Sequence, residues 1–159
     1  LDAPGCGPVT ATVGRISLGK VLISASAVFA GVGPYLADWN ETHIYNPTWP
    51  PHAKFHNAQT MSLGAGLAGA ALLQLWRPAH TTAATRTALD GAAVSAALYW
   101  ATQISALAYP GAKAVDPPGT ATFPQAVIAL PSLALVGMGY ALERRRLRQQ
   151  RAANSTSPS

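Results

Sequence analysis

Four stretches of the chain have no acidic or basic residue in their central part, and each is about 20 residues long. They cover residues 16–36, 57–76, 88–109 and 121–142. At about 1.5 Å per residue, an α-helix of this length matches the hydrocarbon thickness of a bilayer, about 30 Å. Only 11% of the residues are charged, against about 25% in an ordinary soluble domain. The sequence therefore predicts an all-α integral membrane protein with four spans.

The connections between these stretches are short, so neighbouring helices should run antiparallel. We expect an up-down four-helix transmembrane bundle over residues 16–142, preceded by a cytoplasmic segment, 1–15. A basic, disordered cytoplasmic tail, 143–159, should follow the bundle. Gly64, Gly66 and Gly69 give the second helix small faces that allow close backbone approach.

The distribution of cationic residues predicts the orientation of the bundle. Nine of the eleven Lys and Arg residues fall on one side of the four-span arrangement: Arg15, Lys20, Arg77, Arg86, Arg144, Arg145, Arg146, Arg148 and Arg151. By the positive-inside rule, this side is cytoplasmic. Both termini and the second connection would then be cytoplasmic, and the first and third connections would face the opposite compartment. Asp90 should pair with Arg86, one helical turn earlier.

The calculated pI near 9.8 also invites a nucleic-acid interpretation. Five of the eight arginines, however, directly follow the last apolar stretch. This placement is typical of an orientation signal that also contacts anionic lipid headgroups. The expected partner is therefore the lipid bilayer, and no nucleic acid is expected.

Acid, base and metal-ligand capacity is concentrated in the first connection and the start of the second helix. Residues 37–56 hold three of the four histidines and two of the four tryptophans. Pro50-Pro51 should open a helix, since proline suits a first turn. His52, Phe55, His56 and Gln59 would then lie on one helical face. Any chemistry of this chain is expected here.

A polar pocket is expected in the outer third of the bundle, beneath the histidine-bearing loop. Polar side chains at membrane depth normally turn away from lipid. By their position along the helices, Gln59, Tyr99, Gln103 and Gln125 should line the pocket, with Trp39 and Trp49 above them. A lipophilic small molecule would enter it from the bilayer.

One hypothesis for this region is a divalent metal site. His52 and His56 have the i,i+4 spacing at which two imidazoles can bind one ion. Asp38, Glu41 or His43 would complete the ligand set. The alternative is that this spacing, which is common by chance, has no ligand role, and that both histidines make hydrogen bonds at the helix end or within the loop.

A second hypothesis is acid–base catalysis without a metal. Histidine beside a carboxylate can have its pKa tuned towards the working pH. Asp38, Glu41 and His43 supply such a set, with His52 or His56 opposite. A small membrane enzyme of this kind would be an isomerase, hydratase, cyclase or oxygenase of lipophilic molecules.

A third hypothesis is not enzymatic. Trp39 and Trp49 would anchor the loop at the membrane interface, and its charges would be ordinary solvated groups. The loop 37–56 would then cap the bundle or bind a partner protein.

The loop and the start of the second helix resemble a family of small four-span membrane proteins of unknown function found in fungi and bacteria. The motif is Asp38-Trp39-Asn40-Glu41-Thr42-His43, then Asn46-Pro47, then Trp49-Pro50-Pro51-His52-Ala53-Lys54-Phe55-His56-Asn57 and Gln59-Thr60. The resemblance covers most of residues 16–142 and implies a four-helix membrane fold without an established activity. Members are often labelled acetyltransferases, but this chain has no acyl-CoA phosphate-binding loop. The arrangement is also similar, at the level of fold, to sterol-isomerase-like and DoxX-like proteins.

Overall fold

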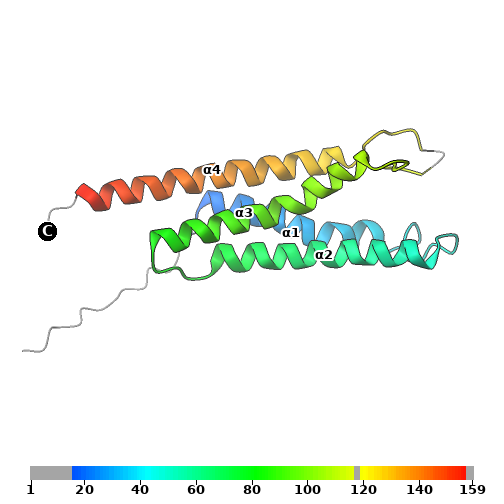
Figure 1. Ribbon diagram of the computed structural model, residues 1–159, viewed down its shortest axis with the longest axis horizontal. Coiled ribbons are helices and arrows are strands. Elements are labelled where there is room, and N and C mark those ends of the chain that lie inside the picture. The colour runs from blue at the N-terminus through cyan, green and yellow to red at the C-terminus, as the bar shows by residue number, and fades with distance from the viewer. Residues whose placement is uncertain (1–15, 117–118, 157–159) are drawn as a thin grey trace, which may run out of the picture.

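Four long helices make up most of the chain. A computed structural model describes residues 16–116 and 119–156. Within these ranges the elements are α1 (Leu18–Asp38), α2 (Pro51–Trp76), α3 (Thr82–Ser105), the 3-10 turn η1 (Ala106–Ala108) and α4 (Ala126–Thr156). The helices lie side by side in an elongated up-down bundle (Figure 1). The described ranges contain no strand, so the predicted all-α fold is confirmed.

The residues at the helix starts explain where the helices begin. The Ser17 hydroxyl accepts a hydrogen bond from the backbone N–H of Lys20, 3.4 Å away, at the start of α1. Thr81 does the same for Ala84 at the start of α3, at 3.1 Å. Both satisfy a backbone donor that has no partner within the helix. α2 begins at Pro51 as predicted. Proline suits this position because it lacks the backbone N–H that would otherwise have no hydrogen-bond partner in the first turn.

α1 and α4 approach closely at two glycines. A Cβ added at Gly19 or Gly139 would lie 2.6 Å from the backbone oxygen of the other residue. Next to this crossing, the Ser17 hydroxyl donates a hydrogen bond to Glu143, whose side chain is buried. Arg146 Nη1 lies 3.6 Å from the other Glu143 oxygen. The first and last helices are therefore joined by backbone contact and by a buried polar group.

α1 and α2 cross at Gly64. A Cβ at this position would lie 2.5 Å from the Ala30 oxygen. At Gly66 and Gly69 it would meet nothing within 4 Å. Of the three glycines expected to allow close backbone approach, only Gly64 lies at a helix contact.

Small side chains make up much of the interior, together with a few large ones such as Leu75, Tyr99 and Trp100. Buried alanines from all four helices fill it, and the largest fully buried side chain is that of Ile23. Trp100 Nε1 donates a buried hydrogen bond to Ser26 Oγ at 3.1 Å, which joins α3 to α1. Small side chains let the helix backbones lie close together over the length of the bundle.

Two helices are long and apolar enough to cross a membrane, namely α1 and the part Ala126–Ala153 of α4. Only 28% of the apolar window of each is buried inside the protein. α2 and α3 do not meet the same test, because glycine and polar residues such as glutamine, threonine and serine lower their mean hydropathy. The helical bundle is thus established, and spanning by all four helices stays a prediction.

Two expectations for the charged end are corrected. α4 does not end near Leu142 but continues to Thr156, so the described part of the basic tail is helical rather than disordered. Arginine, leucine, glutamine and alanine are all good helix formers. Asp90 does not pair with Arg86: its Oδ1 accepts hydrogen bonds from Tyr140 (2.9 Å) and Arg144 (3.3 Å) of α4. The expected segment 1–15 lies outside the described residues.

Candidate functional site

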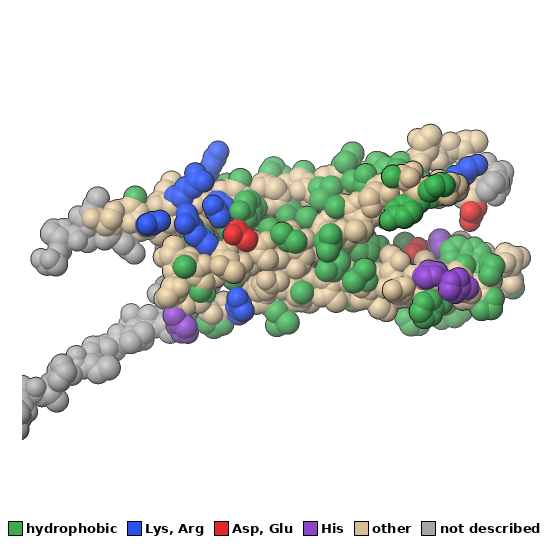
Figure 2. Space-filling model, in the orientation of Figure 1, with side chains coloured by type: hydrophobic (Ala, Val, Ile, Leu, Met, Phe, Trp, Pro, Cys, Tyr) green, Lys and Arg blue, Asp and Glu red, His purple; other side chains and the backbone are tan. Residues whose placement is uncertain are grey.

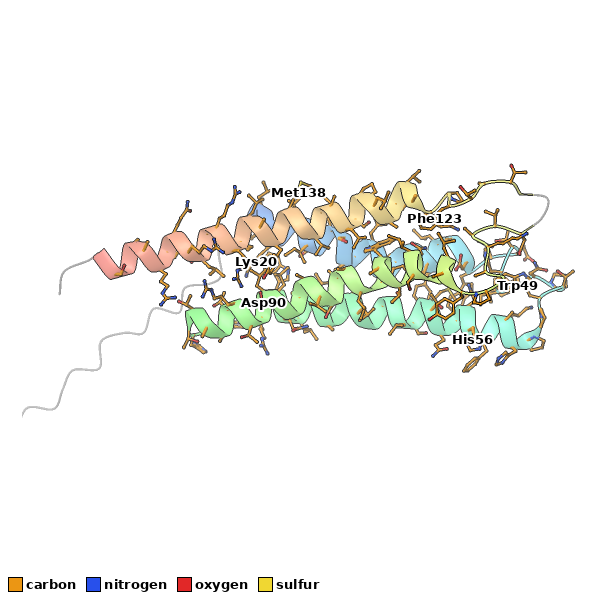
Figure 3. All side chains as sticks on the ribbon, turned by 45° about the horizontal axis from the view of Figure 1, so that its top comes forward. Lys20, Trp49, His56, Asp90, Phe123 and Met138 are labelled. Carbon is orange, nitrogen blue, oxygen red and sulfur yellow. The ribbon has the colours of Figure 1, made fainter. Side chains whose placement is uncertain are left out.

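Most of the candidate site residues gather at one end of the bundle. The loop between α1 and α2 and the connection between α3 and α4 both lie there (Figure 1). Figure 2 shows most Lys and Arg side chains at the opposite end, and most histidines at this one. In Figure 3, Trp49 and His56 lie at this end, whereas Lys20 and Asp90 lie in the other half. The expected separation of basic residues and histidines is therefore present in the fold.

Two asparagines give the 37–56 loop a fixed shape. Asn40 Oδ1 accepts from the Thr42 backbone N–H (2.8 Å) and hydroxyl (2.6 Å). Asn46 Oδ1 accepts from Thr48 in the same way, at 2.9 and 2.7 Å. Their amide groups donate to the backbone oxygens of Ala37 and Thr42. These side chains replace the hydrogen bonds that a loop backbone lacks.

The side chains of Asp38, at the end of α1, and His43, in the loop, lie close together. Asp38 Oδ2 accepts a hydrogen bond from Asn57 Nδ2 of α2 at 2.9 Å. Its other oxygen lies 3.8 Å from His43 Nδ1, and the two side chains are 24% and 33% exposed. His43 Nδ1 also lies 2.7 Å from the Thr42 hydroxyl, and its ring meets the edge of Trp49 with centroids 4.8 Å apart. The pair forms a partly shielded carboxylate–imidazole unit.

Other predicted residues lie apart from this pair. Glu41 is exposed at the loop surface. Trp39 is also exposed; its indole N–H donates to the Tyr45 hydroxyl and its ring stacks on Tyr35. Neither lines the cavity described below. The contacts of Trp39 with Tyr35 and Tyr45 help to hold the loop together.

His52 and His56 form a second group, on the exposed face of α2. Their Nε2 atoms lie 3.0 Å apart, and His56 Nδ1 lies 3.2 Å from Gln59 Oε1. Phe55 stacks on the His52 ring with centroids 6.2 Å apart. This confirms that these four residues share one helical face. Over residues 16–116 and 119–156, no three His, Cys, Asp or Glu side chains are grouped to hold one ion, so no third protein ligand joins the histidines.

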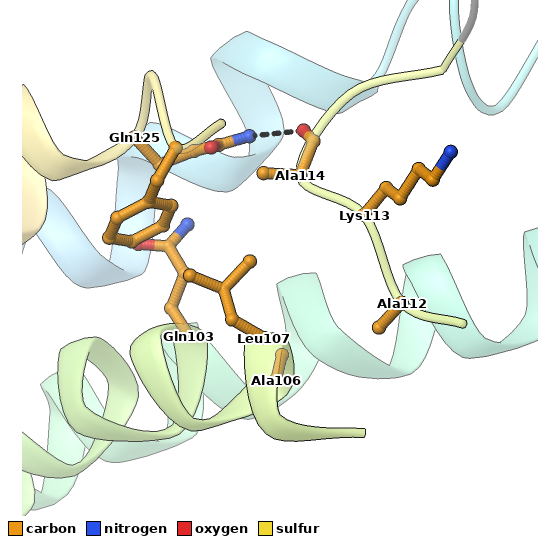
Figure 4. A pocket seen from close by; sticks show the side chains of 8 residues that line it. Gln103, Ala106, Leu107, Ala112, Lys113, Ala114 and Gln125 are labelled. Atoms are coloured by element: carbon orange, nitrogen blue, oxygen red, sulfur yellow. Dashed lines mark hydrogen bonds between the residues drawn. The ribbon is translucent and has the colours of Figure 1, made fainter. Parts of the chain in front are cut away.

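A cavity of about 210 Å³ lies between the end of α3, the connection that follows it and the start of α4 (Figure 4). Eight residues line it: Gln103, Ala106, Leu107, Ala112, Lys113, Ala114, Phe123 and Gln125. Gln125 Nε2 donates to the Ala114 oxygen at 2.9 Å. The side-chain oxygens of Gln103 and Gln125 are buried, and neither has a hydrogen-bond partner. Both glutamines thus line the cavity, and each has a buried side-chain oxygen without a hydrogen-bond partner.

Only two residues of the predicted pocket line this cavity, Gln103 and Gln125. Gln59 is exposed and lies beside His56. Tyr99 is a core residue; its ring meets Trp100 edge-on, with centroids 5.1 Å apart. The sequence pattern does not show which way each side chain points around its helix axis, and Gln125 lies just before α4 rather than within it. The sequence also gave no signal for Phe123, which lies outside the regular helices.

Comparison with known proteins identifies the family without assigning an activity. No curated protein and no solved structure matches the chain. One family model, described as a family of unknown function (DUF6640), matches residues 22–154. This range includes all four helices almost entirely, with the loop and the cavity described above. The chain therefore belongs to the DUF6640 family.

Proposed function

We propose that this chain is a four-span membrane protein that binds a lipophilic molecule bearing a hydrogen-bond donor, at the end of the bundle that carries the histidines. Two observations support the two parts of the proposal. The membrane part is supported by the outward direction of the large apolar side chains. The binding part is carried by two glutamines that line one cavity, each with a buried side-chain oxygen that has no hydrogen-bond partner.

Many alanines lie inside the bundle, and many large apolar side chains are exposed on its outside. Exposed apolar side chains occur on every helix, among them Val28, Phe29 and Val32 on α1, Leu63 and Leu73 on α2, Val94 and Leu98 on α3, and Val127, Leu130 and Met138 on α4. A helical protein in water buries such side chains, whereas lipid solvates them. With 26 and 24 residues, α2 and α3 are about 39 and 36 Å long, enough for a bilayer core. All four helices are therefore suited to contact lipid.

The separation of charge supports one orientation in the membrane. The basic end, with the continuation of α4, would be cytoplasmic, and the loop 37–56 would face the other compartment. Cysteine labelling tests this in a Cys6→Ser background, with His43→Cys and Arg77→Cys in intact cells or sealed vesicles. Labelling by an impermeant maleimide from opposite sides is expected. Labelling of both positions from one side would refute the four-span arrangement.

The cavity between α3 and α4 favours a ligand with an O–H or N–H donor. The amide of Gln125 has a fixed orientation, because its Nε2 donates to Ala114, so its oxygen remains the acceptor. A buried acceptor without a partner destabilises by about 1–3 kcal/mol, and a donor on a ligand would remove this penalty. A cavity of about 210 Å³ has room for a ring or a polar head; an apolar cavity of about 150 Å³ holds benzene.

Cyclohexanol and cyclohexane provide a matched pair of probes for this cavity. We expect cyclohexanol to raise the unfolding temperature of detergent-solubilised protein more than cyclohexane does. Gln103→Leu should abolish the difference, whereas Gln59→Leu, at an exposed glutamine outside the cavity, should retain it. Equal responses of the wild type and Gln103→Leu would refute binding at these oxygens.

The pair Asp38 and His43 favours a second candidate, acid–base catalysis by a small membrane enzyme. A carboxylate 3.8 Å from an imidazole can orient the ring for proton transfer. The alternative is that both side chains only hold the cap of the bundle, since Asp38 also binds Asn57.

Stability measurements separate these two roles. A capping role predicts that Asp38→Ala lowers the free energy of unfolding by about 1–2 kcal/mol, since Asn57 loses a charged partner. Catalytic groups usually leave stability unchanged or raise it when they are removed. Glu41→Ala serves as the control, because this carboxylate in the same loop is exposed. A loss equal to that of the control would refute the capping role.

A further inference from the structure

His52 and His56 lie one turn apart at the start of α2, and their contact has the geometry of a chelating pair. Their Nε2 atoms face each other at 3.0 Å. Metal–nitrogen bonds of about 2.0–2.1 Å put two ligands in adjacent coordination positions about 2.8–3.4 Å apart. The two nitrogens thus already have the separation that one ion would require.

Gln59 fixes which nitrogen of His56 is available. An amide oxygen only accepts hydrogen bonds, so His56 Nδ1 must donate to Gln59 Oε1 across their 3.2 Å contact. In the neutral ring the lone pair is then on Nε2, the atom that faces His52. Histidines that bind metals usually donate their other nitrogen to an oxygen in this way. The supporting hydrogen bond of a metal ligand is therefore present.

We propose that His52 and His56 form a two-histidine site for a divalent transition metal ion. The site binds Cu(II) more tightly than Ni(II) or Zn(II). Imidazole nitrogens suit all three ions, and Cu(II) leads the usual order of affinities. Both side chains are exposed on α2, and in Figure 3 the His56 side chain points away from the other helices. Water fills the remaining coordination positions. When the ion binds, the proton of neutral His52 moves from Nε2 to Nδ1, so that both Nε2 lone pairs bind the ion and no net proton is released. The bound ion clamps the first turns of α2.

This site is separate from the cavity lined by Gln103 and Gln125, because neither histidine contributes to that lining. It also requires no third ligand from Asp38, Glu41 or His43. Binding of the ion and binding of a lipophilic molecule can therefore be tested independently, and one can fail without the other.

Titration of tag-free, detergent-solubilised protein with CuCl2, NiCl2 and ZnCl2 tests the proposal. We expect one equivalent of Cu(II) to bind, with an affinity at least tenfold lower in His52→Ala and in His56→Ala. His80→Ala should bind as the wild type does, because this histidine lies in the connection between α2 and α3. Gln59→Leu should weaken binding by about tenfold, the lower limit for a supporting hydrogen bond.

Electron paramagnetic resonance of the Cu(II)-loaded wild type gives a test that does not depend on any variant. Superhyperfine coupling to two imidazole nitrogens is expected. Equal Cu(II) affinity in the wild type and in the His52→Ala/His56→Ala double variant would overturn the proposal. So would a wild-type spectrum without nitrogen coupling.

Discussion

Replacing Gly64 by alanine tests the crossing of α1 and α2 directly. The added Cβ would lie 2.5 Å from the Ala30 oxygen and 3.1 Å from the Tyr99 ring. A backbone oxygen cannot rotate away as a flexible side chain can, so the two helices must separate. Forcing a methyl group into a packed contact destabilises by about 1–3 kcal/mol.

Two neighbouring glycines in the same helix provide the controls. Gly66→Ala and Gly69→Ala place the methyl group where nothing lies within 4 Å. All three substitutions gain the same intrinsic helix propensity, up to about 1 kcal/mol. That gain cancels when the variants are compared, so Gly64→Ala should be less stable than either control by about 1–3 kcal/mol.

The measurement is the free energy of unfolding in mixed micelles, titrated with sodium dodecyl sulfate and followed by tryptophan fluorescence. A stable Gly64→Ala protein, equal to both controls, would refute the close backbone crossing. Loss of stability in all three variants would also refute it, since the effect would then not depend on the contact with Ala30.

Two further predictions concern the polar contacts between helices. Trp100→Phe should destabilise the protein by about 1–3 kcal/mol, because it leaves the buried Ser26 hydroxyl without its donor. Adding Ser26→Ala to Trp100→Phe should recover part of this loss. Additive effects of the two substitutions in this double-mutant cycle would contradict the contact. Asp90→Asn should change stability by less than about 1 kcal/mol, because the side chain is 48% exposed and pairs with Arg144 at 3.3 Å. This small effect should vanish near 1 M salt, where the Debye length is only about 3 Å. A stability change that persists at this salt concentration would show that the ion pair is not its source.

Local signals in the sequence predict four helices and the start of α2, but α3 begins at Thr82 rather than at residue 88, and α4 covers Ala126–Thr156 rather than 121–142. Pro50-Pro51 marked the start of α2, and i,i+4 spacing placed His52 beside His56. Both depend on residues within one helical turn, where the geometry of the α-helix fixes the outcome.

Contacts between helices were not predictable by the same means. Asp90 was assigned to a residue of its own helix because the rotation of α4, which brings Arg144 to it, is absent from the local pattern. The prediction of the pocket lining has the same weakness, because Gln59 lies on the exposed side of α2. The Asp38–Asn57 contact joins two helices through a loop whose shape depends on Asn40 and Asn46 together.

The contact between α1 and α4 has a consequence for biosynthesis. Gly19 meets Gly139, and Ser17 bonds Glu143 across 126 positions of sequence. The contact of α1 with α2 needs only residues made early, because Gly64 meets Ala30. The contact of α1 with α4 forms only after residues 126–143 have been made. A chain that stops before α4 therefore leaves Gly19 and Ser17 without the residues that they contact in the folded bundle.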